Sequence, residues 1–390
     1  MNRMYRRGYR SFWRDRRFWI DNAHALLVLS TYLLLLLARL IDTAWLSRDN
    51  EYLGVVLLQV LIFLIPGLIY CKLRGTVFTE KLRLRLPRPS HVLFLISALV
   101  ALISGCLLIS ITTGGIKTLD DGFTLYDTFS AKGSGGFGDV LYLLLAYAAL
   151  PAICEEFIWR GVLCVTLEPR GLLPTILYSA LSFGMLHFEF SHLPVYVFAG
   201  ALLCAVLYCT RSLVACVLVH LLYNMFGLFG QPALTGFYRY TDSAELFSFL
   251  LTFIFLLSAV IFCGEASRIY RSYSRAGVAA PYRVDLPREE LPVRLRQTLL
   301  PPVGLVCIAV YILACIFISK IKGEPHLWFP LFCWPCKQNS PPLALGKDKE
   351  FRALRSAGGA GNGAIFAKQI CTERSEEICP CPPTSLLKKA

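Results

Sequence analysis

The chain has 390 residues, of which 56% are hydrophobic and only 17% are charged. A soluble globular domain carries about 25% charged and about 45–50% apolar residues, so this composition excludes a soluble single-core enzyme and a disordered chain. The formal net charge of +13 would indicate a nucleic-acid partner only if the basic residues shared one surface.

Nine apolar runs are candidates for membrane-spanning helices, because such a helix needs about 20 mostly apolar residues, within a range of roughly 17–25. Most of the runs are apolar around the whole helix circumference rather than along one stripe. We therefore predict an all-α fold, a polytopic transmembrane helical bundle of about eight to nine spans. The candidate spans are 23–41, 53–71, 91–113, 140–158, 172–188, 193–210, 213–229, 246–263 and 299–319.

The basic residues alternate from loop to loop along the chain. The N-terminal segment and the loops after the second and eighth spans are rich in Arg and Lys, whereas the first and third loops carry acidic residues. Because cytoplasmic loops carry an excess of Lys and Arg, we predict an integral membrane protein with its N-terminus in the cytoplasm. The charge then orients the chain against an anionic inner leaflet. The predicted partner is therefore membrane lipid, with no nucleic acid.

These features divide the chain into five segments. An Arg-rich cytoplasmic segment (1–22) is followed by N-terminal transmembrane helices with an external loop (23–137) and by a core that carries polar residues (138–230). The rest comprises C-terminal transmembrane helices with a basic cytoplasmic loop (231–319) and a poorly ordered, Cys-containing tail (320–390). Cysteines inside the apolar runs are expected to behave as small hydrophobic residues.

The first candidate cluster lies at the end of the fourth span, where Glu155 and Glu156 are followed by Arg160. An ionisable residue within a span costs about 2.5–3.5 kcal/mol on insertion scales, so it is a functional candidate by default. Glu156 and Arg160 are four residues apart with the acid first, the favoured order for an ion pair. Adjacent residues lie about 100° apart around a helix, which leaves Glu155 free for chemistry. The alternative is an ordinary helix end whose charged side chains reach the interface.

Two further clusters add His187, late in the fifth span, and the pair His220 and Asn224 in the seventh. The pair lies on one helix face, one turn apart. Each side chain could instead simply hydrogen-bond a neighbouring helix. Glu189 and His192 are predicted to lie in an external turn, outside the site. With alternating topology the three clusters lie at different depths, so their convergence requires tilted, broken or shifted helices.

Together the clusters resemble, in order, the motifs EExxxR, FxxxH and HxxxN/D of the CAAX-processing and bacteriocin-immunity (CPBP, or Abi) family of intramembrane proteases. The matching residues are Glu155-Glu156-x3-Arg160, Phe183-x3-His187 and His220-x3-Asn224, within roughly 138–230. The resemblance implies an all-helical protease core in this segment.

The resemblance also implies roles for the six candidate catalytic residues. Glu155 would be the general base that activates water, and His187 and His220 would position that water or a metal ion. Asn224 would hold the water and stabilise the oxyanion, while Glu156 and Arg160 would support the site. Zinc is one implied cofactor, with Glu155, His187 and His220 as its candidate ligands. A metal-independent, glutamate-dependent mechanism is the other.

The predicted function is that of an intramembrane endopeptidase acting on membrane-associated peptide or protein substrates, either prenylated or bacteriocin-related. The alternative is a non-enzymatic membrane transporter or an immunity or binding protein, because intramembrane Glu and His residues also form proton relays. The sequence shows no inverted repeat and no paired broken helices of the transporter kind.

Overall fold

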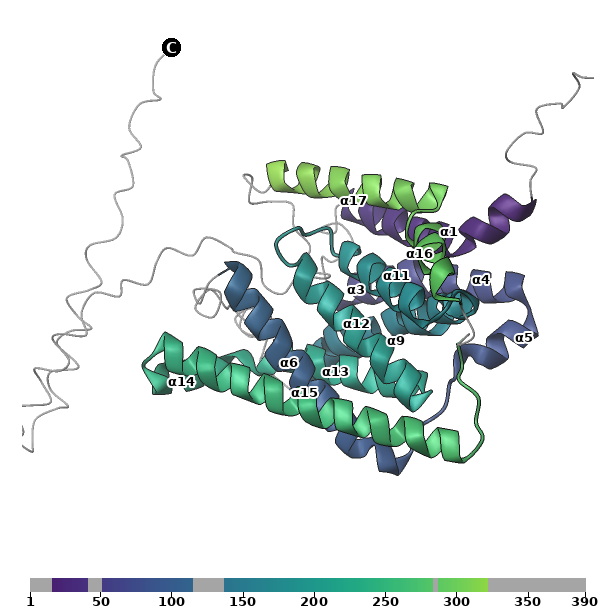
Figure 1. Ribbon diagram of the computed structural model, residues 1–390. Coiled ribbons are helices and arrows are strands. Elements are labelled where there is room, and N and C mark those ends of the chain that lie inside the picture. The colour runs from purple at the N-terminus through teal and green to yellow at the C-terminus, as the bar shows by residue number, and fades with distance from the viewer. Residues whose placement is uncertain (1–15, 41–50, 115–136, 283–286, 322–390) are drawn as a thin grey trace, which may run out of the picture. The chain divides into compact units, whose positions relative to one another are not determined.

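The computed structural model describes residues 16–40, 51–114, 137–282 and 287–321, and all secondary structure within these ranges is helical (Figure 1). The predicted Arg-rich N-terminus up to residue 15, the body of the external loop (115–136) and the Cys-containing tail lie outside the described residues. The fold class predicted from the sequence, an all-α polytopic bundle, is confirmed.

The helices before the third loop form three candidate spans. They are α1 (Arg16–Leu40), then α3 (Glu51–Gln59), the π-helical η2 (Val60–Leu64) and α4 (Ile65–Arg74), then the short α5 (Thr76–Thr79), η3 (Glu80–Leu82) and η4 (Pro89–His91), and finally α6 (Val92–Gly114). After the loop, the fourth span is built from α8 (Phe137–Leu144), η6 (Leu145–Ala149), α9 (Leu150–Glu156), η7 (Phe157–Leu163), α10 (Cys164–Leu167) and η8 (Glu168–Arg170). The remaining helices are α11 (Leu172–Met185), α12 (Leu193–Thr210), α13 (Leu213–Phe229), α14 (Gln231–Thr241), α15 (Ala244–Arg275), η9 (Arg288–Glu290), α16 (Leu291–Leu299) and α17 (Pro302–Ile321).

Seven helices of the described part are long and apolar enough to cross a membrane, or eight if the bent pair Leu213–Phe229 and Ala233–Thr241 is one span. The predicted number was eight to nine, and the difference lies in the seventh run, whose α13 has only 17 residues, and in the fifth run. There α11 has only 14 residues, about 21 Å at 1.5 Å per residue, against a hydrocarbon core of about 30 Å. The chain turns after Met185, so the last apolar residues of the predicted span 172–188 belong to a turn.

The fourth span continues as a helix beyond its predicted end at residue 158, to Arg170. Hydropathy ended the span near the charged residues, but Glu156 and Arg160 are fully buried inside the protein and do not interrupt the helix. Two π-helical segments, η6 and η7, flank the turns of α9. Pro151 lacks an N–H group at the start of α9, and proline and π-bulges are common causes of bends in helices.

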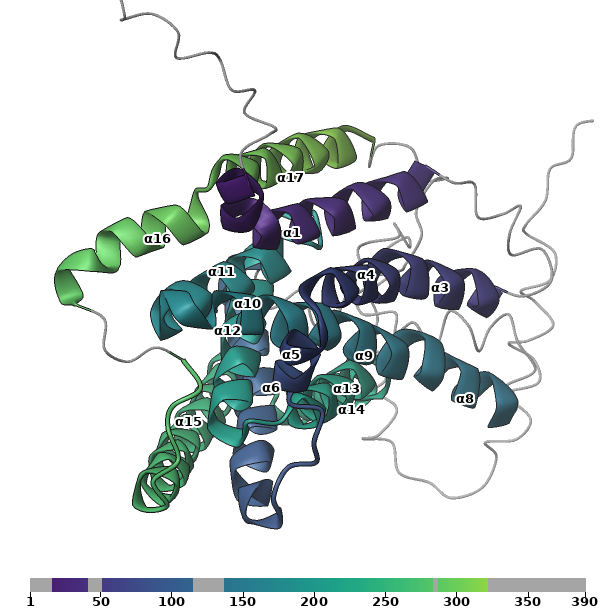
Figure 2. The ribbon, with the colours of Figure 1, turned by 90° about the vertical axis from the view of Figure 1, so that its right-hand side faces the viewer.

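The predicted cytoplasmic loop between the last two spans is partly helical. α15 extends twelve residues past its predicted end, from residue 263 to Arg275, and α16 occupies Leu291–Leu299. α15 packs along α6, and α17 packs along α1 (Figures 1 and 2). α11 packs against α12, and α13 packs against α9.

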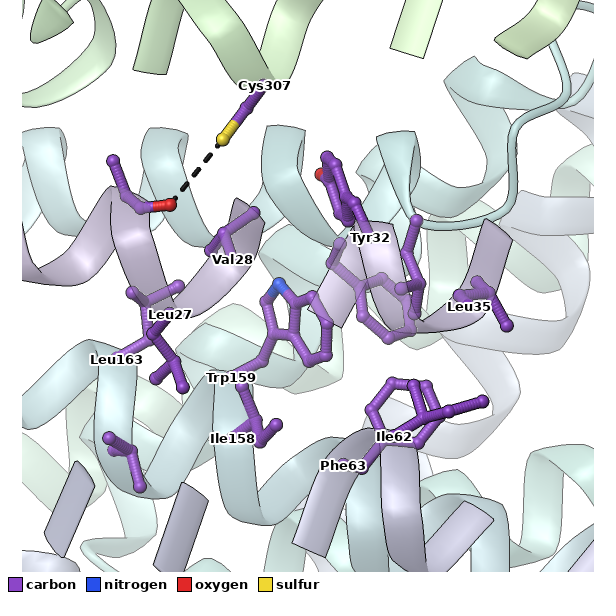
Figure 3. Packing of buried hydrophobic residues seen from close by; sticks show 14 of the residues in the cluster. Leu27, Val28, Tyr32, Leu35, Ile62, Phe63, Ile158, Trp159, Leu163 and Cys307 are labelled. Carbon is purple, nitrogen blue, oxygen red and sulfur yellow. Dashed lines mark hydrogen bonds between the residues drawn. The ribbon is translucent and has the colours of Figure 1, made fainter. Parts of the chain in front are cut away.

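A buried aromatic centre fixes the rotation of the fourth span. Trp159, on η7, is fully buried among side chains of α1 and η2, including Tyr32 and Phe63 (Figure 3). Its indole Nε1 donates to Ser182 Oγ at 3.1 Å, and Tyr32 donates to the Ser182 carbonyl at 2.5 Å. With Trp159 held on that side, the neighbouring Arg160 points to α12 and α13, where the polar residues gather.

Candidate active site

The site is built around the Glu156 carboxylate at the end of α9. Its Oε1 accepts hydrogen bonds from Arg160 Nη1 at 2.7 Å and from His220 Nδ1 at 2.8 Å. The side chains of Glu156 and Arg160 are fully buried, and that of His220 is 8% exposed. The ion pair expected from the i, i+4 spacing is therefore present. The bond to His220 ties it to α13, a helix 64 residues further along the chain.

Arg160 extends this network to two more helices. Its Nη2 donates to the Gly200 carbonyl on α12 at 3.0 Å, and its guanidinium lies 4.6 Å from the centre of the Phe183 ring on α11. A Cβ at Gly200 would lie 2.9 Å from the Cα of Ala180, so only glycine allows α11 and α12 to approach this closely. Arg160 thus fixes the positions of α11 and α12 relative to the fourth span.

Glu155 contrasts with its neighbour. It is 3% exposed, yet no described residue forms a hydrogen bond or an ion pair with its carboxylate. The ionisable groups that interact with it electrostatically include His220, Glu156 and Arg160. One of the two adjacent glutamates is therefore held by partners, and the other is buried beside the same histidine with its oxygens available.

His187 lies in the turn that follows α11. Its Nδ1 is 3.1 Å from the Phe183 carbonyl oxygen, and since a carbonyl can only accept, Nδ1 carries the proton and Nε2 is the acceptor in the neutral ring. The imidazole stacks on Tyr196 of α12, with ring centres 3.6 Å apart and an interplanar angle of 6°. Phe183 contacts it edge-on and also contacts His220, at 5.4 Å and 6.0 Å between ring centres.

Asn224 lies one turn beyond His220 on α13. Its Nδ2 donates to the Ala148 carbonyl at 3.3 Å, which joins α13 to η6 in the fourth span. No hydrogen bond links Asn224 to the other five predicted site residues within the described ranges. It is therefore placed against the same helix as the glutamates, about two turns before them.

The structure resolves the depth problem posed by the sequence. Glu156, Arg160 and His220 are joined by hydrogen bonds, and Glu155 interacts with them electrostatically. His187 joins them across the Phe183 ring and through an electrostatic interaction with His220. Two features bring these residues to a similar depth. α11 is short and ends in a turn, and the fourth span is interrupted by π-helical segments. Convergence is therefore a property of bent and shortened helices.

Sequence reasoning missed the surroundings of His187. Glu189 does lie in the turn between α11 and α12, but it is buried, and its carboxylate pairs with His192 Nδ1 at 3.1 Å. It interacts electrostatically with His187, while Tyr196 stacks on that imidazole. The turn itself agrees with the sequence prediction, and its side of the membrane stays a prediction. The available signal was an acidic residue two positions after His187, with an aromatic residue one turn into the next helix.

The hydrogen bonds of the two histidines also bear on a metal site. Donation of Nδ1–H to a carboxylate or carbonyl, as for His220 and His187, is the arrangement that orients metal-binding histidines. However, within the described ranges no group of three or more His, Cys, Asp or Glu side chains is arranged to hold a metal ion. The residues as placed do not form a complete zinc ligand set, so no chemical step below is assigned to zinc.

Comparison with known protein families identifies a similarity in the segment that carries the site. Residues 137–226 match the family described as Type II CAAX prenyl endopeptidase Rce1-like, a segment that includes all six predicted catalytic residues. A comparison with curated proteins and another with solved structures found no match. The resemblance indicated by the three motifs is thereby confirmed for this segment. The chain is an integral membrane protein, and its residues 137–226 are similar to this CAAX prenyl endopeptidase family.

Proposed function

We propose that this protein is an intramembrane endopeptidase in which Glu155 activates a water molecule for attack on a peptide bond. The observation that carries the proposal is the contrast between the two glutamates. Glu156 accepts bonds from Arg160 and His220, whereas Glu155 is buried beside them with no partner among the described residues. A buried carboxylate without a hydrogen-bond donor destabilises the folded protein. Such groups are found at functional sites, where they bind water or exchange a proton.

The proposed reaction uses the chain's own groups. Glu155 takes a proton from water as the water oxygen bonds to the substrate carbonyl carbon, and the protonated Glu155 returns that proton to the leaving amine as the C–N bond breaks. His187 and His220 hold the water through Nε2, because their Nδ1 atoms are occupied by Phe183 O and by Glu156. The second amide N–H of Asn224 is proposed to donate to the oxyanion.

Glu156 and Arg160 are proposed to position His220 and the surrounding helices. Arg160 offsets the charge of Glu156, so that the carboxylate next to Glu155 adds less repulsion when Glu155 is ionised. The Glu156–His220 bond also fixes the ring orientation.

For the substrate, we propose a prenylated peptide held at the membrane, since the matched family is described as a CAAX prenyl endopeptidase. A bacteriocin-related membrane peptide is the second candidate. Comparing turnover of a farnesylated CAAX-type peptide with that of the same peptide without the prenyl group distinguishes the two. A preference for the farnesylated form supports the first candidate, and equal turnover contradicts it.

The central test is the Glu155→Gln substitution in the purified full-length protein, reconstituted in liposomes with a fluorogenic peptide. We expect turnover to fall by roughly 10²–10⁴-fold, the usual contribution of a general base. The matched control is Glu265→Gln on α15, a glutamate in an exposed ion pair with Arg268, which should keep wild-type turnover. Unchanged turnover of Glu155→Gln would contradict the assignment, and proton-coupled uptake without proteolysis would favour the transporter alternative.

Zinc remains a prediction that the same assay can examine. If Glu155, His187 and His220 bind zinc, a chelator abolishes turnover, added Zn²⁺ restores it, and the purified protein contains about one zinc that His187→Ala removes. Full activity in a metal-free preparation would instead support the glutamate-dependent mechanism.

A further inference from the structure

A second polar site lies at one end of the helix bundle, apart from the catalytic residues. A pocket of about 500 Å³ opens where the segment after α5, the end of the fourth span and the segment after α15 meet. Its charged lining residues are Glu80, Lys81, Arg83, Arg85 and Glu168. Nothing in the proposed peptidase reaction uses these side chains.

The arginine-bearing segment is held in a fixed conformation. Arg83 has a left-handed backbone (φ 58°), and its carbonyl accepts from the Leu213 N–H at 3.0 Å. Ser212 Oγ donates to the Arg85 carbonyl, and Arg85 Nε donates to the Arg211 carbonyl at 2.7 Å. A left-handed non-glycine residue costs free energy, so the contacts with the α12–α13 turn must compensate. The two arginines therefore line the pocket on a segment whose conformation is fixed by these hydrogen bonds.

Several N–H donors of the cationic side chains that line the pocket have no hydrogen-bond acceptor among the described residues. Arg83 pairs with Glu168 through Nη2, while its Nη1 is buried and has no hydrogen-bond partner among the described residues. Likewise, none of the described residues accepts a hydrogen bond from Lys81 or from the Nη groups of Arg85. A buried donor on a charged group that lacks a hydrogen-bond partner destabilises the folded protein, and an anion bound in the pocket would supply that partner.

We propose that this pocket binds a phosphate group, supplied by the headgroup of an anionic phospholipid. Guanidinium groups match phosphate oxygens in pairs, and basic pockets at the ends of membrane helices bind lipid headgroups. The volume lies in the range of about 300–1,000 Å³ typical of small-ligand sites. The segment that would hold the headgroup is hydrogen-bonded to Ser212 and Leu213 at the start of α13, the helix that carries His220. This site does not depend on the proposed peptidase function.

The test is native mass spectrometry of the full-length protein in detergent, titrated with phosphatidylglycerol or with phosphatidylcholine of the same acyl chains. The wild type should retain phosphatidylglycerol preferentially. Lys81→Gln/Arg85→Gln should weaken that retention by roughly 30-fold, because each cation near a membrane surface contributes about fivefold. The matched control Lys72→Gln/Arg74→Gln removes two cations in the last turn of α4 that do not line the pocket, and should bind as the wild type does.

A charge-reversal variant and a competition experiment complete the test. Lys81→Glu reverses the charge of an exposed residue without breaking any hydrogen bond to a described residue, so it tests binding even if the double variant does not fold. Millimolar inorganic phosphate or glycerol 3-phosphate is added as competitor. Displacement of the lipid by these anions supports a phosphate site filled from solution, and no displacement supports the lipid as its source. Equal retention of the two lipids, or wild-type affinity in the pocket variants, would overturn the proposal.

Discussion

Two pairs of candidate membrane-spanning helices differ in how much of their surface the protein itself covers. In the fourth span and in α12, 50% and 61% of the most apolar window is buried inside the protein, against 17% in α15 and 28% in α17. The hydropathy of the same windows runs the other way, 1.6 and 2.0 against 2.7 and 2.5. α15 and α17 are therefore more apolar and less covered by protein than the fourth span and α12, which surround the candidate site.

The same comparison separates two ion pairs of similar sequence spacing. Glu156 and Arg160 are fully buried, whereas the side chains of Glu265 and Arg268 on α15 are 15% and 46% exposed. Removing one partner of a buried ion pair strongly destabilises the protein, because the remaining charge is left unpaired. An exposed ion pair contributes only about 0–1 kcal/mol to stability. The following substitutions test how far this difference holds.

The largest expected effect on stability comes from Arg160→Leu. It leaves Glu156 buried without its main counter-charge, which costs about 3–5 kcal/mol, so the denaturation midpoint in detergent should fall strongly. Arg268→Leu on α15, the matched control, should cost no more than about 1 kcal/mol. The double variant Glu156→Leu/Arg160→Leu should recover part of the loss, since two apolar residues leave no unpaired charge. Similar midpoints for Arg160→Leu and Arg268→Leu would contradict the distinction.

A smaller effect is expected from adding one methyl group at Gly200. The new Cβ would lie 2.9 Å from the Ala180 Cα, forcing α12 from α11 at an expected cost of about 1–3 kcal/mol. The carbonyl that accepts from Arg160 would shift with it. Gly264→Ala on α15 is the control, because its Cβ would meet nothing within 4 Å, and it should stabilise the helix by up to about 1 kcal/mol. Thermal unfolding of both variants decides the point, and a stable Gly200→Ala would refute close packing.

The smallest effect is expected at Tyr196, which stacks on His187. Tyr196→Leu should lower kcat by about 3–10-fold with little change in KM, because an aromatic pair contributes about 0.5–1.5 kcal/mol and the loss frees the imidazole to rotate. Tyr196→Phe keeps the ring and should restore kcat. Phe249→Leu, on the exposed face of α15, should have no effect on kcat. Equal loss in Tyr196→Phe and Tyr196→Leu would argue against stacking as the cause.

Much of the fold could be predicted from local pattern. The span at 193–210 agrees with α12, and the runs near 23–41, 53–71 and 91–113 each correspond to a spanning helix. Local spacing also predicted the Glu156–Arg160 ion pair, and the burial of free Cys106, Cys204, Cys216 and Cys307 agrees with their expected role as small hydrophobic residues. The N-terminal orientation given by the basic loops stays a prediction.

Other features could not be read from the sequence, for a common reason. Hydropathy reports that a residue avoids water, not whether lipid or protein covers it, so it made α11 too long and ended the fourth span too early. Hydropathy also gave no indication that the turn carrying Glu189 is covered by Tyr311 of α17, whose hydroxyl donates to the Glu189 carbonyl at 3.2 Å.

The sequence by itself determined that this is a helical membrane protein, and it named the six polar residues on which a protease site would depend. It could do so because burying a charge in a bilayer is costly enough to stand out against an apolar background. The spacing also indicated that Glu156 is the paired glutamate, but only the tertiary structure decided which distant residue joins the pair. That choice rests on the bond between Glu156 and His220, and contacts between distant helices follow from packing rather than from local periodicity.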